Sequence, residues 1–165
     1  MTAQAFNDRI MQPALEAATP LINIPRSREA DQMLLTIAGQ ESAWRHRFQI
    51  VSGRPGAKGP ARGFWQFERN GGVAGVMTHR SSAQRAAALT EARGLPFERR
   101  ALWEALETDD VLAVGFARLL LWTDPRALPR TSAAGWNYYI HNWRPGKPHP
   151  SKWPRLWDES QRALK

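Results

Sequence analysis

The sequence predicts a single compact domain that is mainly α-helical, with at most a small turn-rich β element around residues 48–68. Three observations support this fold class. The 165 residues are enough for one domain with a substantial core. Apolar residues recur at helical spacing through most of the chain, and one Gly- and Pro-rich stretch, "VSGRPGAKGPARG", interrupts that pattern. No repeat or low-complexity tract divides the chain, so residues 1–165 are expected to form one domain.

The first half of the chain predicts helices on either side of one linker. Residues 1–20 predict one or two short helices, interrupted near Pro13 and stopped at Pro20. The next helix is expected to begin after Ser27, a good N-cap residue, and to run to Trp44. After the Gly- and Pro-rich stretch, "FWQFE" predicts a short aromatic element.

The second half predicts four more helices. Two exposed ones are expected at residues 82–93 and 97–107, separated by "GLP". Residues 109–122 are the most apolar and predict a central buried helix. "TSAAGWNYYIHNW" predicts a helix capped by Thr131 or Ser132.

The C-terminal segment begins with "RPGKPHPSKWP", which predicts an extended tail. "RLWDESQRAL" then predicts a closing short helix. We expect Trp153 and Trp157 in this region to pack on the core, although Lys152 and Arg155 leave contact with a partner as the alternative.

The charge and composition restrict the possible partners and cofactors. The net charge is +8 and 19 of the 23 basic residues are arginine, which predicts attraction to nucleic acid, a membrane surface or an anionic cell-wall polymer. Cysteine is absent, which excludes disulfides and Cys-based metal sites, and the four histidines lack ligand spacing. No metal or organic cofactor is expected. No stretch reaches the roughly 20 apolar residues of a membrane span, and the N-terminus lacks secretory-signal features.

The first candidate for chemistry is Glu41, in the stretch "IAGQESAWRHR". Helical spacing places it on the same face as four apolar residues: Met33, Leu34, Ile37 and Ala38. A glutamic acid in apolar surroundings has a raised pKa and can act as a general acid near neutral pH. The simpler alternative is a glutamate at the end of a helix that either extends to water or forms an ion pair with Arg45, four residues further on.

The second candidate stretch is "GPARGFWQFE". Phe64 and Phe67 are expected to fill the core. A tryptophan face can stack on a sugar ring and a glutamine amide can bind its hydroxyl or N-acetyl groups, so Trp65 and Gln66 are candidates for ligand contact. Gly63 would allow a ligand to approach the backbone closely.

The third stretch is "AAGWNYYIHNW". Asn137, Tyr138 and Tyr139 place amide and phenol groups on a helix that already carries aromatic residues. They form either a wall for a polyhydroxylated ligand or a hydrogen-bonded part of the core.

In order and spacing, these three stretches resemble the soluble lytic transglycosylase and goose-type lysozyme superfamily. Glu41-Ser42 corresponds to the family's catalytic Glu followed by Ser. Residues 61–66, "ARGFWQ", correspond to "GA-x-G-L-M-Q", with Phe-Trp in place of Leu-Met. In the third motif, "A-Y-N-A-G", Trp136-Asn137 stands in place of Tyr-Asn, and Tyr138-Tyr139 replaces Ala-Gly.

The resemblance implies a lysozyme-like fold and cleavage of the β-1,4 bond between N-acetylmuramic acid and N-acetylglucosamine in peptidoglycan, with Glu41 as the catalytic acid. In the family a tyrosine helps to hold that acid, and here Trp136, Tyr138 or Tyr139 could do so. The residues expected to contact substrate are Ser42, Gly63, Phe64, Trp65, Gln66, Glu68, Asn137, Tyr138 and Tyr139.

Two reaction outcomes stay open. A lytic transglycosylase uses a single acid and forms 1,6-anhydro ends, whereas a hydrolase uses a second carboxylate to position water. Glu68 is the nearest candidate for that carboxylate, unless it pairs with Arg62 or Arg69. Asp109 and Asp110 are expected to be helix caps instead. We favour the transglycosylase.

A small basic chain without cysteine or a signal is similar to a bacteriophage endolysin or a virion-associated wall-degrading enzyme. It would be made in a host cytoplasm, act on the cell wall, and depend on a holin or on injection for release. The expected partners are peptidoglycan glycan strands and an anionic envelope surface, and the chain is expected to be a monomer. Two other classes are a basic nucleic-acid-binding protein, disfavoured because the arginines are scattered, and an inactive phage structural protein.

Overall fold

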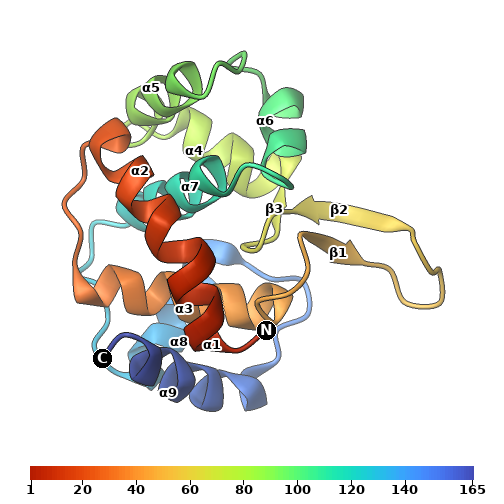
Figure 1. Cartoon of the computed structure of the whole chain (residues 1–165), viewed down its shortest axis with the longest axis vertical. Coiled ribbons are helices and arrows are strands. Elements are labelled where there is room, and N and C mark those ends of the chain that lie inside the picture. Colours follow the sequence, from red (N-terminus) through yellow and green to blue (C-terminus); the bar gives the residue numbers. More distant parts are fainter.

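The computed structural model describes residues 1–165, and 62% of them are helical, which confirms the mainly α prediction. The α-helices, in chain order, are α1 (Ala3–Phe6), α2 (Gln12–Ile22), α3 (Arg28–Ser42), α4 (Ala74–Thr78), α5 (Ala83–Ala92), α6 (Arg99–Ala105), α7 (Asp110–Thr123), α8 (Ser132–Trp143) and α9 (Trp153–Ala163). Figure 1 shows α4, α5 and α6 at one end of the molecule, and α3, α8 and α9 at the other. No helix combines the length and the apolar composition needed to cross a lipid bilayer.

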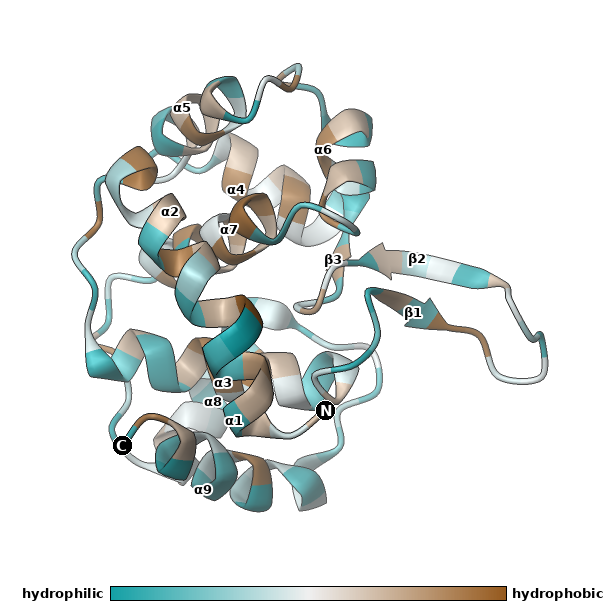
Figure 2. Cartoon of the chain, in the orientation of Figure 1, coloured by the Kyte–Doolittle hydropathy of each residue, from teal (hydrophilic) through white to brown (hydrophobic).

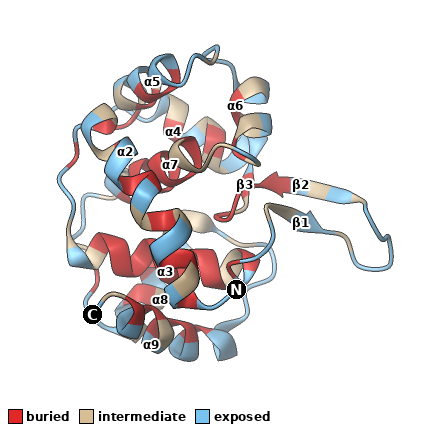
Figure 3. Ribbon diagram, in the orientation of Figure 1, coloured by how far each residue is buried: buried red, intermediate tan, exposed pale blue.

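Helix α7 is the centre of the core, as the sequence predicts. Every residue from Leu112 to Leu121 is buried, and the helix contacts α2, α3 and α5. Figure 2 shows its apolar composition and Figure 3 its burial. The Asp109 side chain accepts a hydrogen bond of 2.9 Å from the Leu112 amide, which confirms that Asp109 caps this helix.

The N-terminal helical segment extends further than predicted. A π-helical turn, Asn7–Met11, joins α1 to α2, and Pro13 lies in the first turn of α2. Pro20 does not stop the helix, because α2 continues to Ile22. A proline so close to the C-terminus removes few backbone hydrogen bonds, and burial of Ile22 holds the last turn in place.

Helix α3 begins where predicted and ends two residues earlier. The Ser27 side chain accepts a hydrogen bond of 3.1 Å from the Ala30 amide and so caps the helix. Ala43 and Trp44 both have positive φ angles, 53° and 54°, which end the helix at Ser42. The chain reverses there, and the Trp44 indole donates a hydrogen bond of 2.8 Å back to the Leu35 carbonyl.

The Gly- and Pro-rich stretch forms part of the small sheet that the sequence allows for. Strands β1 (Phe48–Ile50), β2 (Lys58–Arg62) and β3 (Phe67–Glu68) form an antiparallel sheet in the order β1-β2-β3. Figure 1 shows the β1–β2 hairpin projecting from the helical body. Strand β3 leads into a second π-helical turn, Arg69–Val73, and then into α4; neither of these was predicted.

The other helices lie close to their predicted positions. Helices α5 and α6 begin and end within two residues of the expected bounds, and Thr131 caps α8. The C-terminal helix begins earlier than predicted, at Trp153 after a 3-10 turn, because a proline is tolerated in the first turn of a helix. Trp153 is 1% exposed and Trp157 is 5% exposed, which confirms that both pack on the core.

Candidate active site

Glu41 lies in the last turn of α3, at the boundary between the core and a cleft. The four apolar residues predicted on its face are completely buried: Met33, Leu34, Ile37 and Ala38. Glu41 itself is partly exposed and lines the cleft. It forms no ion pair with Arg45, because the helix has already ended at Ser42. The prediction of this ion pair is therefore wrong.

The surroundings of Glu41 favour its protonated form. Burial removes water from the carboxylate and raises the pKa of Glu41 from 4.5 to about 7. A hydrogen bond from Tyr139 lowers this pKa, and the negative charge of Glu68 raises it. Because the burial effect is the largest, a substantial fraction of Glu41 carries a proton at neutral pH.

Tyr139 orients the Glu41 carboxyl group. Its hydroxyl donates a hydrogen bond of 2.6 Å to Glu41 Oε1, joining α8 to the end of α3. Burial is the main cause that raises the pKa of Tyr139 far above its usual value, with the Glu41 charge adding to it. The phenol therefore remains a hydrogen-bond donor. Of the three residues proposed for this role, the structure selects Tyr139.

Aromatic rings from α8 and α9 hold Tyr139 in place. The Trp153 ring stacks on the Tyr139 ring with centroids 5.1 Å apart and an interplanar angle of 19°. Trp136, another of the three candidates for orienting Glu41, instead packs against both rings, with centroid distances of 5.4 and 5.6 Å. The C-terminal helix therefore contributes to the position of the carboxyl group without lining the cleft.

The turn from Gly63 to Gln66 supports α3 and does not form the wall of the cleft. The Trp65 side chain is 1% exposed and its indole donates a hydrogen bond of 2.9 Å to the Leu34 carbonyl. Phe64 is 2% exposed and packs edge-on against Phe6. The prediction that Trp65 stacks on a ligand, and the placing of Phe64 in the site, are wrong because both rings are needed in the core.

Gly63 is required for a close contact within the chain, not for contact with a ligand. Its φ angle is 72°, and a Cβ atom there would lie 2.8 Å from the Leu106 carbonyl oxygen. Gln66 does line the cleft, and its amide donates a hydrogen bond of 2.8 Å to the Gly63 carbonyl. Of the residues from Gly63 to Gln66, only Gln66 reaches the cleft.

Three more predicted contact residues lie outside the cleft. Ser42 is buried and donates a hydrogen bond of 2.8 Å to the Ala38 carbonyl. Tyr138 is buried and its hydroxyl donates to the Leu121 carbonyl at 2.8 Å. Asn137 is exposed on α8 but is not among the residues that line the cleft, because the helix turns it away.

The cleft has a volume of about 1030 Å³ and brings together four of the predicted residues: Glu41, Gln66, Glu68 and Tyr139. Only 6 of its 25 lining residues are hydrophobic, so it offers many hydrogen-bonding groups. Its volume is at the upper end of that of small-molecule sites. These properties suit an extended, polar ligand.

Glu68 is the second carboxylate in the cleft. It is exposed and forms no ion pair, since Arg62 pairs with Glu107 at 3.2 Å instead. Asp109 and Asp110 lie outside the cleft, the first as the helix cap and the second paired with Arg47 at 2.6 Å. Glu41 and Glu68 are the only acidic residues that line it.

Trp143 is a cleft residue that sequence reasoning did not single out. It follows Tyr139 by one helical turn, lines the cleft and is partly exposed. Its indole donates a hydrogen bond of 3.1 Å to the Trp65 carbonyl, and its ring contacts Phe67. The spacing of four residues from Tyr139 was the available signal, because such residues share a helix face. Trp143, and not Trp65, is therefore the tryptophan that lines the cleft.

No protein-family model, curated protein or solved structure matches the chain. The structure also holds no cluster of three or more His, Cys, Asp or Glu residues that could hold a metal ion. The fold and the cleft define a small helical domain with a carboxyl group at the edge of a polar cleft, and the raised pKa of that group leaves it partly protonated at neutral pH.

Proposed function

We propose that the protein is a lysozyme-like enzyme that cleaves the β-1,4 bond between N-acetylmuramic acid and N-acetylglucosamine in peptidoglycan. One observation carries the proposal: Glu41 is desolvated, has a pKa of about 7 and is oriented by Tyr139 in a polar cleft. A carboxyl group in this state suits proton donation to a glycosidic oxygen. Trp143 offers an aromatic surface for a sugar ring.

In the proposed reaction, Glu41 donates its proton to the glycosidic oxygen while the bond from that oxygen to C1 of the muramoyl sugar breaks. The Glu41 carboxylate then accepts the proton of the muramoyl 6-hydroxyl group while the oxygen of that hydroxyl group attacks C1. A 1,6-anhydro ring forms and Glu41 regains its proton. This lytic transglycosylase reaction needs only one carboxyl group and no cofactor.

Hydrolysis is the second candidate reaction, and the position of Glu68 supports it. Glu68 lines the same cleft, and its charge acts on the pKa of Glu41. A carboxylate there could position or deprotonate a water molecule that attacks C1. The products would then carry reducing muramic acid ends.

The biological setting is proposed from the charge and from the resemblance. The net charge of +8 would favour binding to the anionic envelope of a bacterium, as suits a phage endolysin or a virion-associated enzyme. Release to the wall would then depend on a holin or on injection with the virion.

The test is loss of turbidity of purified bacterial cell walls with the wild-type protein, Glu41→Gln and Glu16→Gln. Glu16 is an exposed glutamate on α2 without an ion pair and serves as the matched control. We expect Glu41→Gln to lose about 10²- to 10⁴-fold in rate, because a general acid contributes that much. Equal activity of all three proteins would exclude Glu41 from the reaction. Mass spectrometry of the products distinguishes anhydro ends from reducing ends.

A further inference from the structure

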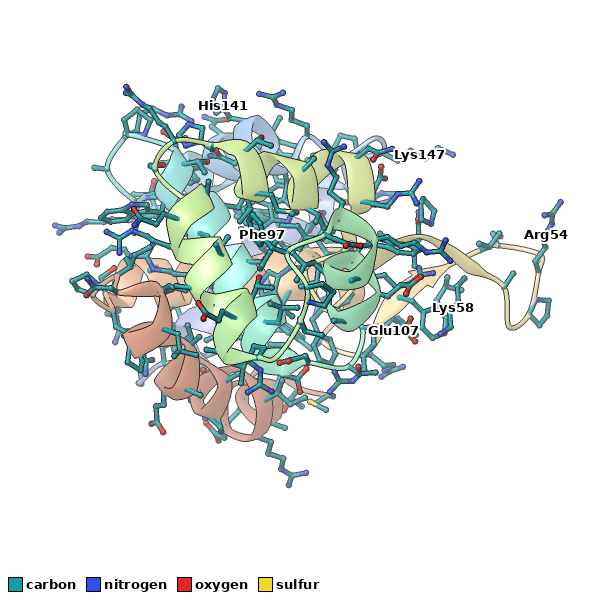
Figure 4. All side chains as sticks on the ribbon, turned by 90° about the horizontal axis from the view of Figure 1, so that it is seen from above. Arg54, Lys58, Phe97, Glu107, His141 and Lys147 are labelled. Carbon is teal, nitrogen blue, oxygen red and sulfur yellow. The ribbon has the colours of Figure 1, made fainter.

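One side of the cleft carries basic side chains that the proposed reaction does not use. Four residues form this basic wall: His141, Arg144, Lys147 and His149. They come from the last turn of α8 and the loop that follows it, and all four are exposed. Figure 4 shows His141 and Lys147 on one side of the molecule, and Arg54 at the far end of the projecting hairpin.

The two permanent charges of the basic wall have no acidic partner within the chain. Nine ion pairs occur in the structure, and none includes Arg144 or Lys147. Glu68 is the only acid besides Glu41 in the cleft lining and comes from another element, β3. The wall therefore presents unpaired positive charge to whatever occupies the cleft.

The basic wall is attached to the elements that hold the carboxyl group. Gln40, next to Glu41, donates a side-chain hydrogen bond of 3.2 Å to the His149 carbonyl. Arg144 ends α8 with a φ angle of 48°, and its Nε donates to the His141 carbonyl at 3.3 Å. A ligand that contacts Glu41 therefore lies beside the basic wall, whose position relative to Glu41 is fixed by these hydrogen bonds.

A neutral glycan offers these cations no negative charge to pair with. The sugar backbone of peptidoglycan has hydroxyl and N-acetyl groups, whereas its negative charge lies on carboxylates of the peptides that branch from each muramic acid. Arginine binds carboxylates with paired hydrogen bonds, and lysine attracts them as a point charge. The peptides leave the glycan at the same sugar whose bond would be cleaved at Glu41.

We propose that the basic wall binds carboxylates of the peptides carried by muramic acid, so that the enzyme prefers peptide-bearing glycan strands to bare ones. This inference rests on the proposed function. Arg144 and Lys147 are the specificity-determining residues. They act on the substrate beside the cleaved bond and take no part in proton transfer.

The experiment uses soluble glycan strands that an endopeptidase has released with their peptides attached. The comparison uses the same strands after an amidase has removed the peptides and after the lactyl carboxylates that this leaves on muramic acid have been coupled to methylamine, which makes these bare strands neutral. Cleavage is measured as kcat/KM by chromatography of the fragments. The variants are the double change Arg144→Gln/Lys147→Gln and the control Arg54→Gln/Arg99→Gln. The control removes the same charge from two exposed residues that form no ion pair and lie outside the cleft.

We expect the wild type to prefer peptide-bearing strands about 3- to 10-fold, which is the effect of two solvent-exposed charge contacts. The Arg144→Gln/Lys147→Gln variant should lose most of this preference and keep its rate on bare strands, while the control keeps both. Equal wild-type rates on the two strands, or equal effects of the two double variants, would overturn the inference and leave the proposed function standing. Failure of the wild type to cleave either strand would overturn the proposed function and the inference with it.

Discussion

The hydroxyl of Tyr139 donates a 2.6 Å hydrogen bond to Glu41 Oε1 and so connects α8 with the last turn of α3. This contact acts on Glu41 in two ways. It fixes the direction of the carboxyl group, and it lowers the pKa of Glu41 against the larger effect of burial. Glu41 is therefore oriented while it keeps much of its proton at neutral pH.

The free energy of unfolding should fall as the pH rises through the titration of Glu41. The folded chain holds this proton up to about pH 7, whereas the unfolded chain releases it near pH 4.5. Between these values the folded state binds more protons, so its stability decreases with pH. The loss should reach about 3 kcal/mol above pH 7 and be absent below pH 4.5.

Urea unfolding of the wild type and Glu41→Gln at several pH values measures this effect. The difference in free energy between the two proteins isolates Glu41 from the other titrating groups. We expect Glu41→Gln to gain stability relative to the wild type as the pH rises from 4.5 to 7. A difference that does not change with pH would show that Glu41 keeps an ordinary pKa.

Tyr139→Phe should shift the activity profile to higher pH. The variant removes the hydrogen bond that lowers the pKa of Glu41, so the acid should keep its proton at higher pH. The falling limb of kcat/KM, expected near pH 7 in the wild type, should move upward, and the maximal rate should drop about 10- to 100-fold from lost orientation. A limb that stays in place would contradict the proposed contact.

Glu68→Gln should shift the falling limb of the kcat/KM profile to lower pH. Removing the charge of Glu68 removes a cause that raises the pKa of Glu41, so the limb should move to lower pH. If Glu41 works as a single acid, the maximal rate should stay within about tenfold of the wild type. A loss of about 10²-fold or more would instead assign Glu68 to the positioning of water.

Trp65→Ala should affect stability strongly. The side chain is 1% exposed and donates a hydrogen bond to the Leu34 carbonyl, so its removal leaves a large cavity and removes that hydrogen bond. We expect a loss of about 3–5 kcal/mol in the free energy of unfolding. Trp122, which is 40% exposed, is the matched control, and Trp122→Ala should cost about 1 kcal/mol or less. Similar losses for both variants in chemical denaturation would show that Trp65 is not a core residue.

Gly63→Ala should be more destabilising than Gly53→Ala. The two glycines have nearly equal φ angles, 72° and 73°, so the backbone strain of about 1–2 kcal/mol is shared. Only at Gly63 does an added Cβ meet another group, the Leu106 carbonyl oxygen at 2.8 Å. We therefore expect Gly63→Ala to lose about 1–3 kcal/mol more of the free energy of unfolding than Gly53→Ala, as measured by thermal unfolding. Equal losses for the two variants would contradict the close contact between residue 63 and the Leu106 carbonyl.

The helices were predictable because their signals are local. Ser27 and Thr131 cap helices that begin directly after them, and apolar spacing marks the buried α7. The position of Glu41 on an apolar face follows from the same spacing. Errors at Pro20 and at the end of α3 arose where burial of a nearby residue, Ile22 or Trp44, outweighed the local preference of the backbone.

The sequence by itself determined which residues share a helix face, and with that the placement of a carboxyl group at the edge of the core. Only the tertiary structure decided which partners meet there: that Tyr139 and not Trp136 contacts Glu41, and that Trp143 and not Trp65 faces the cleft. The physical reason is that helical spacing repeats within one segment and specifies a face. The group that this face meets depends on how α3, α8 and α9 pack, across separations of about a hundred residues.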